Sequence, residues 1–544
     1  MRRDLRAIDL CLCFFLTIFG LVLAGARAGF AQQTSPAQAG SQAQQTVEQS
    51  TYTFKVSANL VQLDVVVRNA KGDLVTGLRR EDFTVLEDGQ PQKILSFDFT
   101  TPTPRSAAGL AGIDSTAELD RRQPEAPVTI IVLDELATKF EDEYFERYFM
   151  QKYLSKQGEA LDQPMMLIAR TLDRTMVLCD YTTSKKKLLK ALNNHLVGND
   201  WRNQNPSFKD VQLAAEFASL FEVAEATQGH PGHKNLVWIG HGFPGLQWSN
   251  MGQDQSAPLQ QLVAKCVEQM REARITLYVI DPGGVSPATE HMDENGVESL
   301  DDPFGGVVDF GKMATATGGL SMHGRNDIDH LIDNAVANGE TFYSLAYRPS
   351  WTGDEDSGQF HKIKVVLNDS SLVAISRQGY FPNVAGDSGG KGATGAGSQF
   401  DLASACSGLM VFDGVPLTVT RKNPSAAEVQ VSFPASAIGL ALTGDKLTGD
   451  VTFLVLSYDR AGKLLTKKGS VVSLHLAPLP PGQSEDRKIQ LAASLDPQAP
   501  AARVRLVVRA NANGRIGADN FFLVDPATLR DRQSGLKAQK TASH

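Results

Sequence analysis

A short apolar run in the first half of the chain constrains the fold most strongly. Residues Val128 to Leu133 are all apolar or β-branched, and the run ends at Asp134. Such a run is typical of a strand that is buried on both faces, as in the centre of a parallel sheet. The next segment, Phe140 to Leu154, has aromatic residues at helical spacing, which predicts a helix. A strand, an acidic loop and a helix therefore begin a βαβ succession, and ligands bind at the carboxyl ends of strands in such sheets.

The alternation of strand and helix patterns continues to residue 338. Further strands are expected at 165–171, 175–179, 235–239, 274–280 and 319–322. Further helices are expected at 184–195, 208–227, 257–273, 307–316 and 328–337. This pattern predicts a doubly wound α/β sheet over residues 127–338, with helices on both faces.

Two short β segments flank this α/β region. In residues 52–100 the apolar positions recur with period two, as at Val61, Leu63 and Val65, which predicts strands with one apolar face. Residues 339–382 show further strand patterns, at 341–347, 361–367 and 372–380. Neither segment is large enough to bury a core alone. We therefore expect the two segments to pack together as one β module that the α/β region interrupts.

The first residues have the pattern of an export signal. A basic start is followed by the apolar run Leu10 to Leu23 and then by Ala26-Arg27-Ala28. These three parts are typical of a secretory signal peptide that is cleaved after Ala28 or after Ala31. An uncleaved membrane anchor is the alternative, but the apolar run is short for a span. We expect a secreted or periplasmic protein.

The remaining boundaries follow from composition. A segment that is dominated by Gln, Ala, Ser and Thr is expected to be a disordered linker. A second linker is rich in Pro, Ala and Thr, and a third is rich in Gly. The strand pattern after residue 400, with Arg503 to Arg509 alternating, predicts a further β-sandwich. The resulting divisions are: signal peptide 1–28, disordered linker 29–51, N-terminal β unit 52–100, linker 101–126, α/β domain 127–338, β strands 339–382, linker 383–400, C-terminal β-sandwich 401–527 and loose tail 528–544.

Charge and cysteine usage exclude several classes of protein. The formal net charge is −8, and without a strongly basic region we expect no nucleic-acid partner. Only Cys179, Cys266 and Cys406 follow the signal peptide, and an odd number gives no disulfide framework. No later apolar stretch is long enough to cross a membrane.

Four stretches resemble a known family. These stretches are Val65–Leu78, Glu81–Gly89, Thr341–Pro349 and Arg377–Phe381. Together they are similar to the VWFA-related domain family of secreted acidobacterial proteins, over roughly residues 52–382. The resemblance implies a von Willebrand factor A-like α/β domain, a class that normally carries a metal-ion-dependent adhesion site.

The residues for such a metal site are incomplete here. The class pattern is Asp-x-Ser-x-Ser after the first strand and an Asp after the fourth strand. Asp134 matches the first position, Leu136 replaces a coordinating hydroxyl, and Thr138 replaces the second serine. The fourth strand is followed by His241 between two glycines. Because Mg²⁺ prefers several oxygen ligands, we expect no bound cofactor, with Mg²⁺ at Asp134 and Thr138 as the alternative. Asp134 would otherwise bond local amides or cap the next helix.

Three further patterns have both a structural and a functional interpretation. His230, His233 and His241 lack the frame of a zinc site, so loop histidines are the better interpretation. The glycines of Gly240 to Gly245 suit a tight turn, although a hydrolase loop with amides facing an oxyanion is the alternative. The aromatic residues from Tyr144 to Tyr153 are expected in the core, with a recognition surface as the alternative.

These observations favour a secreted, non-enzymatic protein-binding module of the adhesion type with a degenerate metal site. A protein partner is expected at the carboxyl ends of the strands, near Asp134, Glu135, Tyr181 and His241. The alternatives are a secreted hydrolase that uses the Gly240 to Gly245 loop, or a structural envelope component. The sequence names neither the partner nor the oligomeric state, and no residue is assigned to catalysis.

Overall fold

The computed structural model describes most of the chain after residue 59. The described ranges are 60–103, 108–171, 175–195, 209–243, 245–247, 253–283, 304, 307–349, 360–382, 402, 405–406, 408–421, 428–460, 463–477, 487–494 and 501–524. The expected signal peptide (1–28), the linker 29–51, the linker 383–400 and the tail 528–544 all lie outside these ranges.

A six-stranded sheet forms the centre of the α/β region, in the order β12-β10-β8-β5-β6-β7. Its strands are β5 (Val128–Asp134), β6 (Ala160–Arg170), β7 (Thr175–Ser184), β8 (Lys234–Ile239), β10 (Ile275–Ile280) and β12 (Ser321–Met322). β7 runs antiparallel to β6, and the other pairings are parallel. Every residue of β5 is buried, so the apolar run is indeed a strand covered on both faces.

Helices cover both faces of this sheet. Ile131 and Leu133 of β5 share one apolar cluster with α4, α5 and α9. Ile130 and Val132, which point the other way, share a second cluster with α6, α7 and α8. The helices are α4 (Phe140–Lys156), α5 (Lys185–Asn194), α6 (Lys209–Ala226), α7 (Gln253–Glu272), α8 (Phe310–Ala316) and α9 (Ile328–Glu340). A small ladder of β9 (Leu246–Gln247) and β11 (Val307–Val308) precedes α8.

Part of the segment 101–126 is packed, which differs from the expected linker. Helix α3 (Thr116–Arg122) begins at the Ser115 cap, whose side chain accepts from the amide of Glu118. Leu110, Ile113 and Leu119 are buried in the same cluster as Ile130. These three apolar residues outweigh the Pro, Ala and Thr around them, because each removes apolar surface from water.

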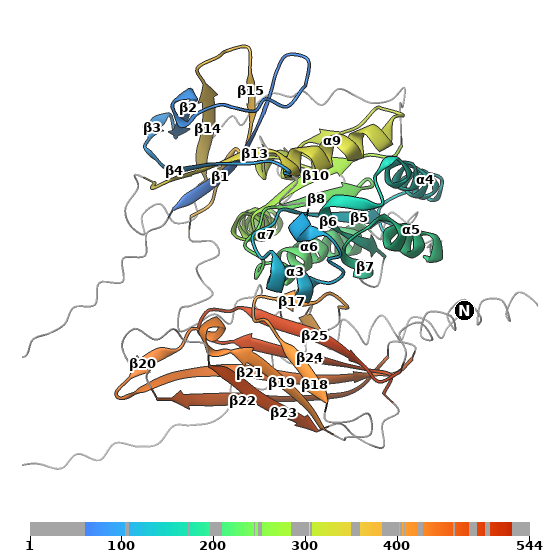
Figure 1. Cartoon of the computed structure of the whole chain (residues 1–544), viewed down its shortest axis with the longest axis vertical. Helices are drawn as coiled ribbons and strands as arrows, with labels where there is room; N and C mark the ends of the chain where they lie inside the picture. The colour runs from blue at the N-terminus through green and yellow to red at the C-terminus, as the bar shows by residue number, and fades with distance from the viewer. Residues whose placement is uncertain are drawn as a thin grey trace, which may run out of the picture. The chain divides into compact units, whose positions relative to one another are not determined.

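Two four-stranded sheets combine the β segments on either side of the α/β region (Figure 1). The first has the order β15-β1-β13-β4 and the second β16-β14-β2-β3. The strands are β1 (Val61–Arg68), β2 (Phe83–Glu87), β3 (Gln90–Gln92), β4 (Ile94–Thr100), β13 (Phe342–Tyr347), β14 (His361–Leu367), β15 (Val373–Ile375) and β16 (Gly379–Tyr380), and a 3₁₀ turn (Arg80–Asp82) precedes β2. β1 pairs with β13, and β2 pairs with β14. The two sheets enclose one apolar core that contains Leu63, Val85 and Tyr343. We call these eight strands the β module.

The residues after 407 form two further sheets around a shared core. Their strands are β17 (Phe412–Asp413), β18 (Thr418–Arg421), β19 (Glu428–Pro434), β20 (Ala441–Thr443), β21 (Lys446–Tyr458), β22 (Leu464–Leu476), β23 (Lys488–Ser494), β24 (Arg503–Ala510) and β25 (Ile516–Phe522), with a 3₁₀ turn at Ala435–Ile438. The sequence predicted that β24 has one buried face, but Arg505 on its other face is also fully buried. The reason is that the guanidinium donates to the carbonyls of Ala405 and Met410. None of the helices in the described ranges is both long and apolar enough to cross a membrane.

Candidate functional site

The loops that follow β5, β8 and β10 meet at the carboxyl end of the central sheet. Gly240 has φ 147°, and a Cβ there would lie 2.3 Å from Cβ of Asp134. Gly242 has φ 60°, and a Cβ there would lie 2.4 Å from the ring of Phe310. Any other residue at either position would force these groups apart. The two glycines therefore hold His241 in a fixed place between β5 and β10.

The Asp134 carboxylate is fully buried and is occupied by backbone amides. Its Oδ1 accepts from the amides of Leu136 at 3.1 Å and Ala137 at 2.9 Å. Its Oδ2 accepts from the amide of Gly242 at 3.0 Å. This is the structural role in which the carboxylate bonds local amides, and it ties the β5 loop to the β8 loop.

The His241 side chain lies between two carboxylates. Its Nε2 is 3.1 Å from Oδ2 of Asp142 on α4, and its Nδ1 is 3.2 Å from Oδ1 of Asp281 after β10. Burial alone would lower the pKa of His241, but the hydrogen bonds and charges of Asp281 and Asp142 outweigh burial and raise it. Burial would raise the pKa of Asp281, and the contact with His241 instead lowers it. The three groups therefore favour an imidazolium held by two carboxylates.

Three more carboxyl groups lie buried around Asp134. Burial, with the neighbouring carboxylates of Glu135 and Asp134, raises the pKa of Glu143 to about 8. Burial and Asp134 also raise the pKa of Glu146 and of Glu216 well above the ordinary value. Burial therefore favours the neutral, protonated form of these side chains, because a buried charge without a partner is strongly unfavourable.

Only one of the four residues expected to meet a partner is appreciably exposed. Asp134 is buried, and Glu135 is 4% exposed and contacts the imidazole of His195. Tyr181 is 1% exposed within β7. The side chain of His241 is 27% exposed. Asp134 and Glu135 are therefore buried beneath the loops and stabilise them. Of the four residues, only His241 reaches the surface.

Tyr181 also lies at the opposite end of the sheet, so its expected position is wrong. Its neighbour Thr182 pairs with Met165 of β6, and Met165 pairs with Thr129 near the amino end of β5. The sequence pattern ended the strand at Cys179, whereas β7 continues to Ser184. Because β7 runs antiparallel to β6, its later residues move away from the carboxyl ends.

The inward face of α4 carries glutamates where apolar residues are usual. Its buried described residues follow helical spacing, and they are Glu143, Glu146, Met150, Tyr153 and Leu154. The first two turns thus present acids to the interior, beside Asp134. This reverses the usual polarity of a surface helix.

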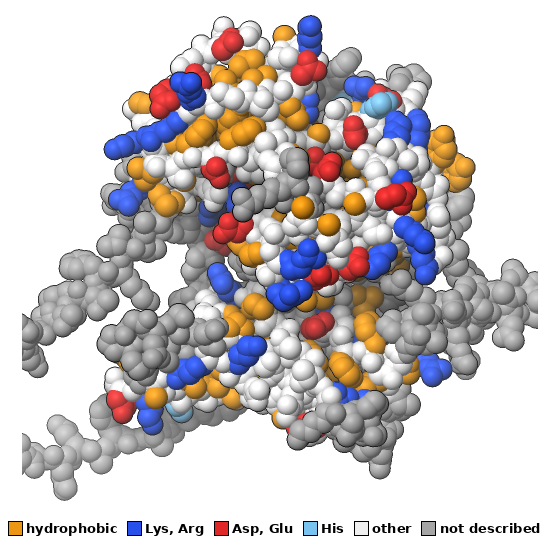
Figure 2. All heavy atoms as spheres, in the orientation of Figure 1, with side chains coloured by type: hydrophobic (Ala, Val, Ile, Leu, Met, Phe, Trp, Pro, Cys, Tyr) orange, Lys and Arg blue, Asp and Glu red, His pale blue; other side chains and the backbone are white. Residues whose placement is uncertain are grey.

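The outward face of the same turns is aromatic, which corrects the core prediction for three of the aromatic residues, whereas Tyr153 is buried as predicted. Tyr144 is 68% exposed, Phe145 is 44% exposed and Tyr148 is 47% exposed. Apolar side chains are visible at the surface over α4 in Figure 2. Tyr148 packs edge-on against Phe149 with ring centroids 5.1 Å apart. We call Tyr144, Phe145 and Tyr148 the α4 aromatic face, and it begins within one turn of Asp142.

The histidines do not form a metal site. His230 and His233 precede β8, where His230 lies 2.8 Å from the carbonyl of Ala126 and His233 lies 2.8 Å from Asp64. His241 follows the other end of β8. Among the described residues there is no group of three His, Cys, Asp or Glu side chains arranged to hold a metal ion.

The first three amides of the Gly240 loop are bonded within the protein. The amide of Gly240 donates to the carbonyl of Ile280 at 2.9 Å. The amide of His241 donates to the hydroxyl of Thr138 at 3.3 Å, and that of Gly242 donates to Asp134. An oxyanion hole needs donors aimed at the reacting atom, and these three amides point into the protein instead.

Sequence reasoning missed Asp142 and Asp281 as the partners of His241. Asp281 follows β10 just as Asp134 ends β5, so its place at the carboxyl end was available as a signal. Asp142 lies 99 positions from His241 along the chain. Only the folded arrangement brings these two residues together.

Comparison with known proteins gives little support for a particular family. No family model matches the chain, and no curated protein matches it. Among solved structures, the proximal thread matrix protein 1 of the mussel byssus aligns at 12% identity over 44% of this chain and 51% of that chain, with a TM-score of 0.24. A second crystal form of that protein aligns at 11% identity over 31% and 39% of the two chains, with a TM-score of 0.20.

The SpRpn10 VWA domain is also similar, at 14% identity over 30% of this chain and 90% of that chain, with a TM-score of 0.16. This chain therefore matches about two fifths to one half of the byssus protein and most of the VWA domain. The similarity to a VWA domain is partial and weak, and no argument about function rests on it.

Proposed function

We propose that this chain is an exported, non-enzymatic protein-binding module. In this proposal the α/β region is a doubly wound domain of the von Willebrand factor A kind, flanked by β-sandwich modules. Its metal-ion-dependent adhesion site is degenerate, so side chains bind the partner in place of a metal ion. The partner is a protein that docks on the α4 aromatic face, with the charged His241 group beside it.

The exposed aromatic rings of α4 are the observation that carries this proposal. Tyr144, Phe145 and Tyr148 occupy two successive turns and remain between 44% and 68% exposed. Large aromatic side chains are enriched where protein interfaces form and supply much of their binding energy. The contacts of Phe145 and Tyr148 with Phe149 hold the rings in place before binding, which limits the entropy lost on association.

The polar neighbours add charge selectivity to this surface. Asp142 and Asp281 hold His241 in its charged form, so one cation and two carboxylates lie close to the start of the aromatic face. Such groups at the rim of an interface steer the partner and fix its orientation more than they add affinity.

Site-specific photo-crosslinking tests the surface. A photoreactive phenylalanine analogue replaces Tyr148 in the full chain, and the purified protein is mixed with an extract of the native cell envelope. The matched control places the same analogue at Leu442, which is 65% exposed on β20. We expect one dominant crosslinked protein from position 148 and not from position 442. The same pattern from both positions would refute the proposal.

The purified partner then allows a quantitative test. Tyr144→Ala is expected to weaken binding at least about tenfold, as for an aromatic residue at the centre of an interface. The thermal midpoint of Tyr144→Ala should stay near that of the wild type, because the side chain is 68% exposed. Lost binding together with lost stability would instead indicate a structural role.

Export is a separate part of the proposal, since it rests on residues outside the described ranges. N-terminal sequencing of the mature protein is expected to begin at Gly29 or at Gln32. A mature chain that begins at Met1 would contradict export by a cleaved signal.

A further inference from the structure

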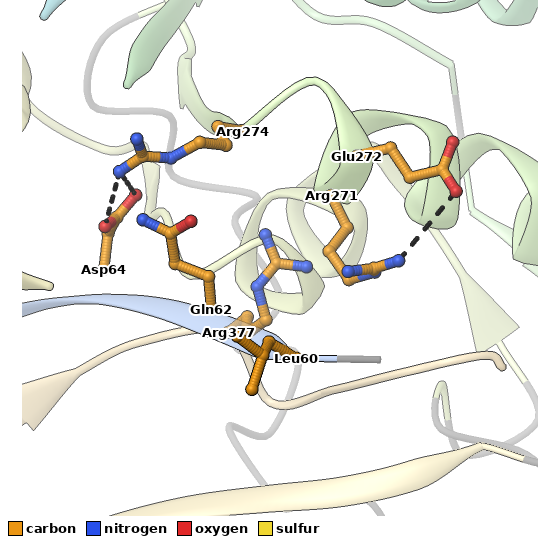
Figure 3. A pocket seen from close by; sticks show the side chains of 7 residues that line it. All are labelled: Leu60, Gln62, Asp64, Arg271, Glu272, Arg274 and Arg377. Atoms are coloured by element: carbon orange, nitrogen blue, oxygen red, sulfur yellow. Dashed lines mark hydrogen bonds and ion pairs between the residues drawn. The ribbon is translucent and has the colours of Figure 1, made fainter. Parts of the chain in front are cut away.

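A small pocket lies between the first strand of the β module and the end of α7 (Figure 3). Its volume is about 180 Å³. A water molecule takes about 30 Å³ of liquid, so there is room for several waters or for one small ion. The residues that line the pocket are Leu60, Gln62, Asp64, Arg271, Glu272, Arg274 and Arg377.

Alternation along β1 explains why a polar wall faces α7. Val61, Leu63 and Val65 point into the core of the β module. Gln62 and Asp64 lie between them and point toward the pocket, because successive side chains of a strand face opposite sides.

One of the three arginines of the pocket forms an ion pair with Asp64. Nη2 of Arg274 donates to both carboxylate oxygens of Asp64, at 3.0 and 3.1 Å. Asp64 also contacts His233 and accepts from the hydroxyl of Ser344, each at 2.8 Å. Burial would raise the pKa of Asp64, but these contacts lower it strongly. These contacts occupy the Asp64 carboxylate, and the ion pair already balances the charge of Arg274.

A second arginine is held in position with part of its guanidinium still facing the pocket. Nε of Arg271 donates to Oε1 of Glu268 at 2.7 Å. Its guanidinium lies 5.9 Å from the ring centroid of Tyr380 and 4.0 Å from the Glu272 carboxylate. Burial, together with Glu268, raises the pKa of Glu272 and so favours its neutral form.

Arg377 places a buried charge beside the pocket, with Glu268 and Asp64 acting on it only through space. It is 8% exposed, and in the described part of the chain its guanidinium makes no hydrogen bond or ion pair. Figure 3 shows this guanidinium between Gln62 and Arg271. Burial, and then the nearby charge of Arg271, lowers the pKa of Arg377 to about 10. Arg377 therefore remains charged at neutral pH, and a buried charge favours a counter-ion.

We propose that this pocket binds one small oxyanion, a phosphate or a carboxylate group, with Arg377 as its main donor and Arg271 as its second. A guanidinium presents donors in a planar fork that matches the oxygens of either group. The ion would lie against β1, α7 and the segment between β15 and β16 that carries Arg377. It would thereby join the β module to the α/β region. This site is distinct from the α4 aromatic face and does not rest on the proposed function.

Calorimetric titration of the full chain tests the site. Inorganic phosphate and succinate are titrated separately, which distinguishes a phosphate from a carboxylate ligand. We expect one equivalent of at least one of them to bind the wild type, and Arg377→Gln to weaken that binding at least about tenfold. Arg325→Gln is the matched control, because Arg325 is an exposed arginine with an ion pair to Asp327 outside the pocket.

A second measurement on the wild type tests the site even if Arg377→Gln does not fold. In the wild type, the bound anion should slow the modification of Arg377 by phenylglyoxal, as measured by peptide mass spectrometry, and should leave Arg325 unprotected. Arg377→Lys keeps the charge and should retain part of the affinity. The proposal is refuted if neither anion binds at tens of millimolar, or if binding is unchanged in Arg377→Gln.

Discussion

The Asp134 carboxylate and the Gly242 amide are joined by a hydrogen bond of 3.0 Å that links the loops after β5 and β8. The same carboxylate accepts two amides of its own loop. The residue at which an adhesion site would begin is thus a structural residue in this chain. The consequences for stability and for metal binding follow from that one arrangement.

Replacing Asp134 should destabilise the protein. Asp134→Ala leaves three backbone amides without an acceptor, and each unsatisfied buried group costs about 1–3 kcal/mol. We expect the free energy of unfolding in urea to fall by at least about 2 kcal/mol. Asp369→Ala is the matched control, because Asp369 is an exposed carboxylate that bonds only Ser371. A fall of equal size in both variants would contradict the role given to Asp134.

Divalent cations should bind too weakly to regulate the protein. Mg²⁺ favours several oxygen ligands in an octahedron, but the Asp134 oxygens already accept amides and Leu136 has no donor atom. The Thr138 hydroxyl accepts from the His241 amide. Calorimetric titration of the full chain with Mg²⁺ and Mn²⁺ should give no sub-millimolar binding. Such binding in the wild type, lost in Asp134→Ala, would show an adhesion site after all.

The His241 contacts should stabilise the protein at low pH more than at high pH. The folded pKa of His241 is raised from the ordinary value of 6.5. Its contribution to stability is therefore complete below about pH 6.5 and is lost as the pH rises through the folded pKa. The difference in unfolding free energy between wild type and His241→Gln should shrink from pH 6 upward. His330→Gln, at an exposed position of α9, should show no such trend.

Glu143 should have a comparable effect at the base of α4. Its pKa is raised from 4.5 to about 8 in the folded state. Below about pH 4.5 it is neutral in both states, and its contribution is lost as the pH rises toward 8. Glu143→Gln should be the more stable protein at pH 8, because the amide has no charge to bury. Glu141→Gln, in the exposed first turn, should follow the wild type; if Glu143→Gln does so too, the raised pKa is wrong.

The order of strands and helices could be predicted because the apolar residues recur with the period of the strand or helix that buries them. The run Val128 to Leu133 is β5 almost to the residue, and α5 begins directly after Ser184, where the expected helix 184–195 starts. Short strands were less predictable. The pattern at 372–380 gave one strand, whereas the structure has β15 and β16 in different sheets. A change of sheet leaves no mark in local periodicity.

The candidate site was less predictable because it depends on side chains that break the usual rules. The apolar residues of Phe140 to Leu154 give a helix but do not show which face is outward. The buried face of this helix contains Glu143 and Glu146, although acids are almost never fully buried without a partner. The rings of Tyr144 and Tyr148 were therefore assigned to the core. The pairing of His241 with Asp142 and Asp281 requires three separate segments to be placed first.

The insertion of the α/β region into the β module sets an order of assembly. Gln62 of β1 donates to the hydroxyl of Ser344 on β13 at 3.0 Å, although 282 positions separate the two residues. Closing so long a loop in an unfolded chain is entropically unfavourable, and contacts of this kind form slowly. The α/β region can form its own core meanwhile, and its folding brings β4 and β13 together. The β module is therefore the later of the two to form during synthesis. Unfolding of the α/β region also separates the two segments that form the β module. A destabilising substitution in the central sheet therefore disrupts the β module as well, although no residue of the β module is altered.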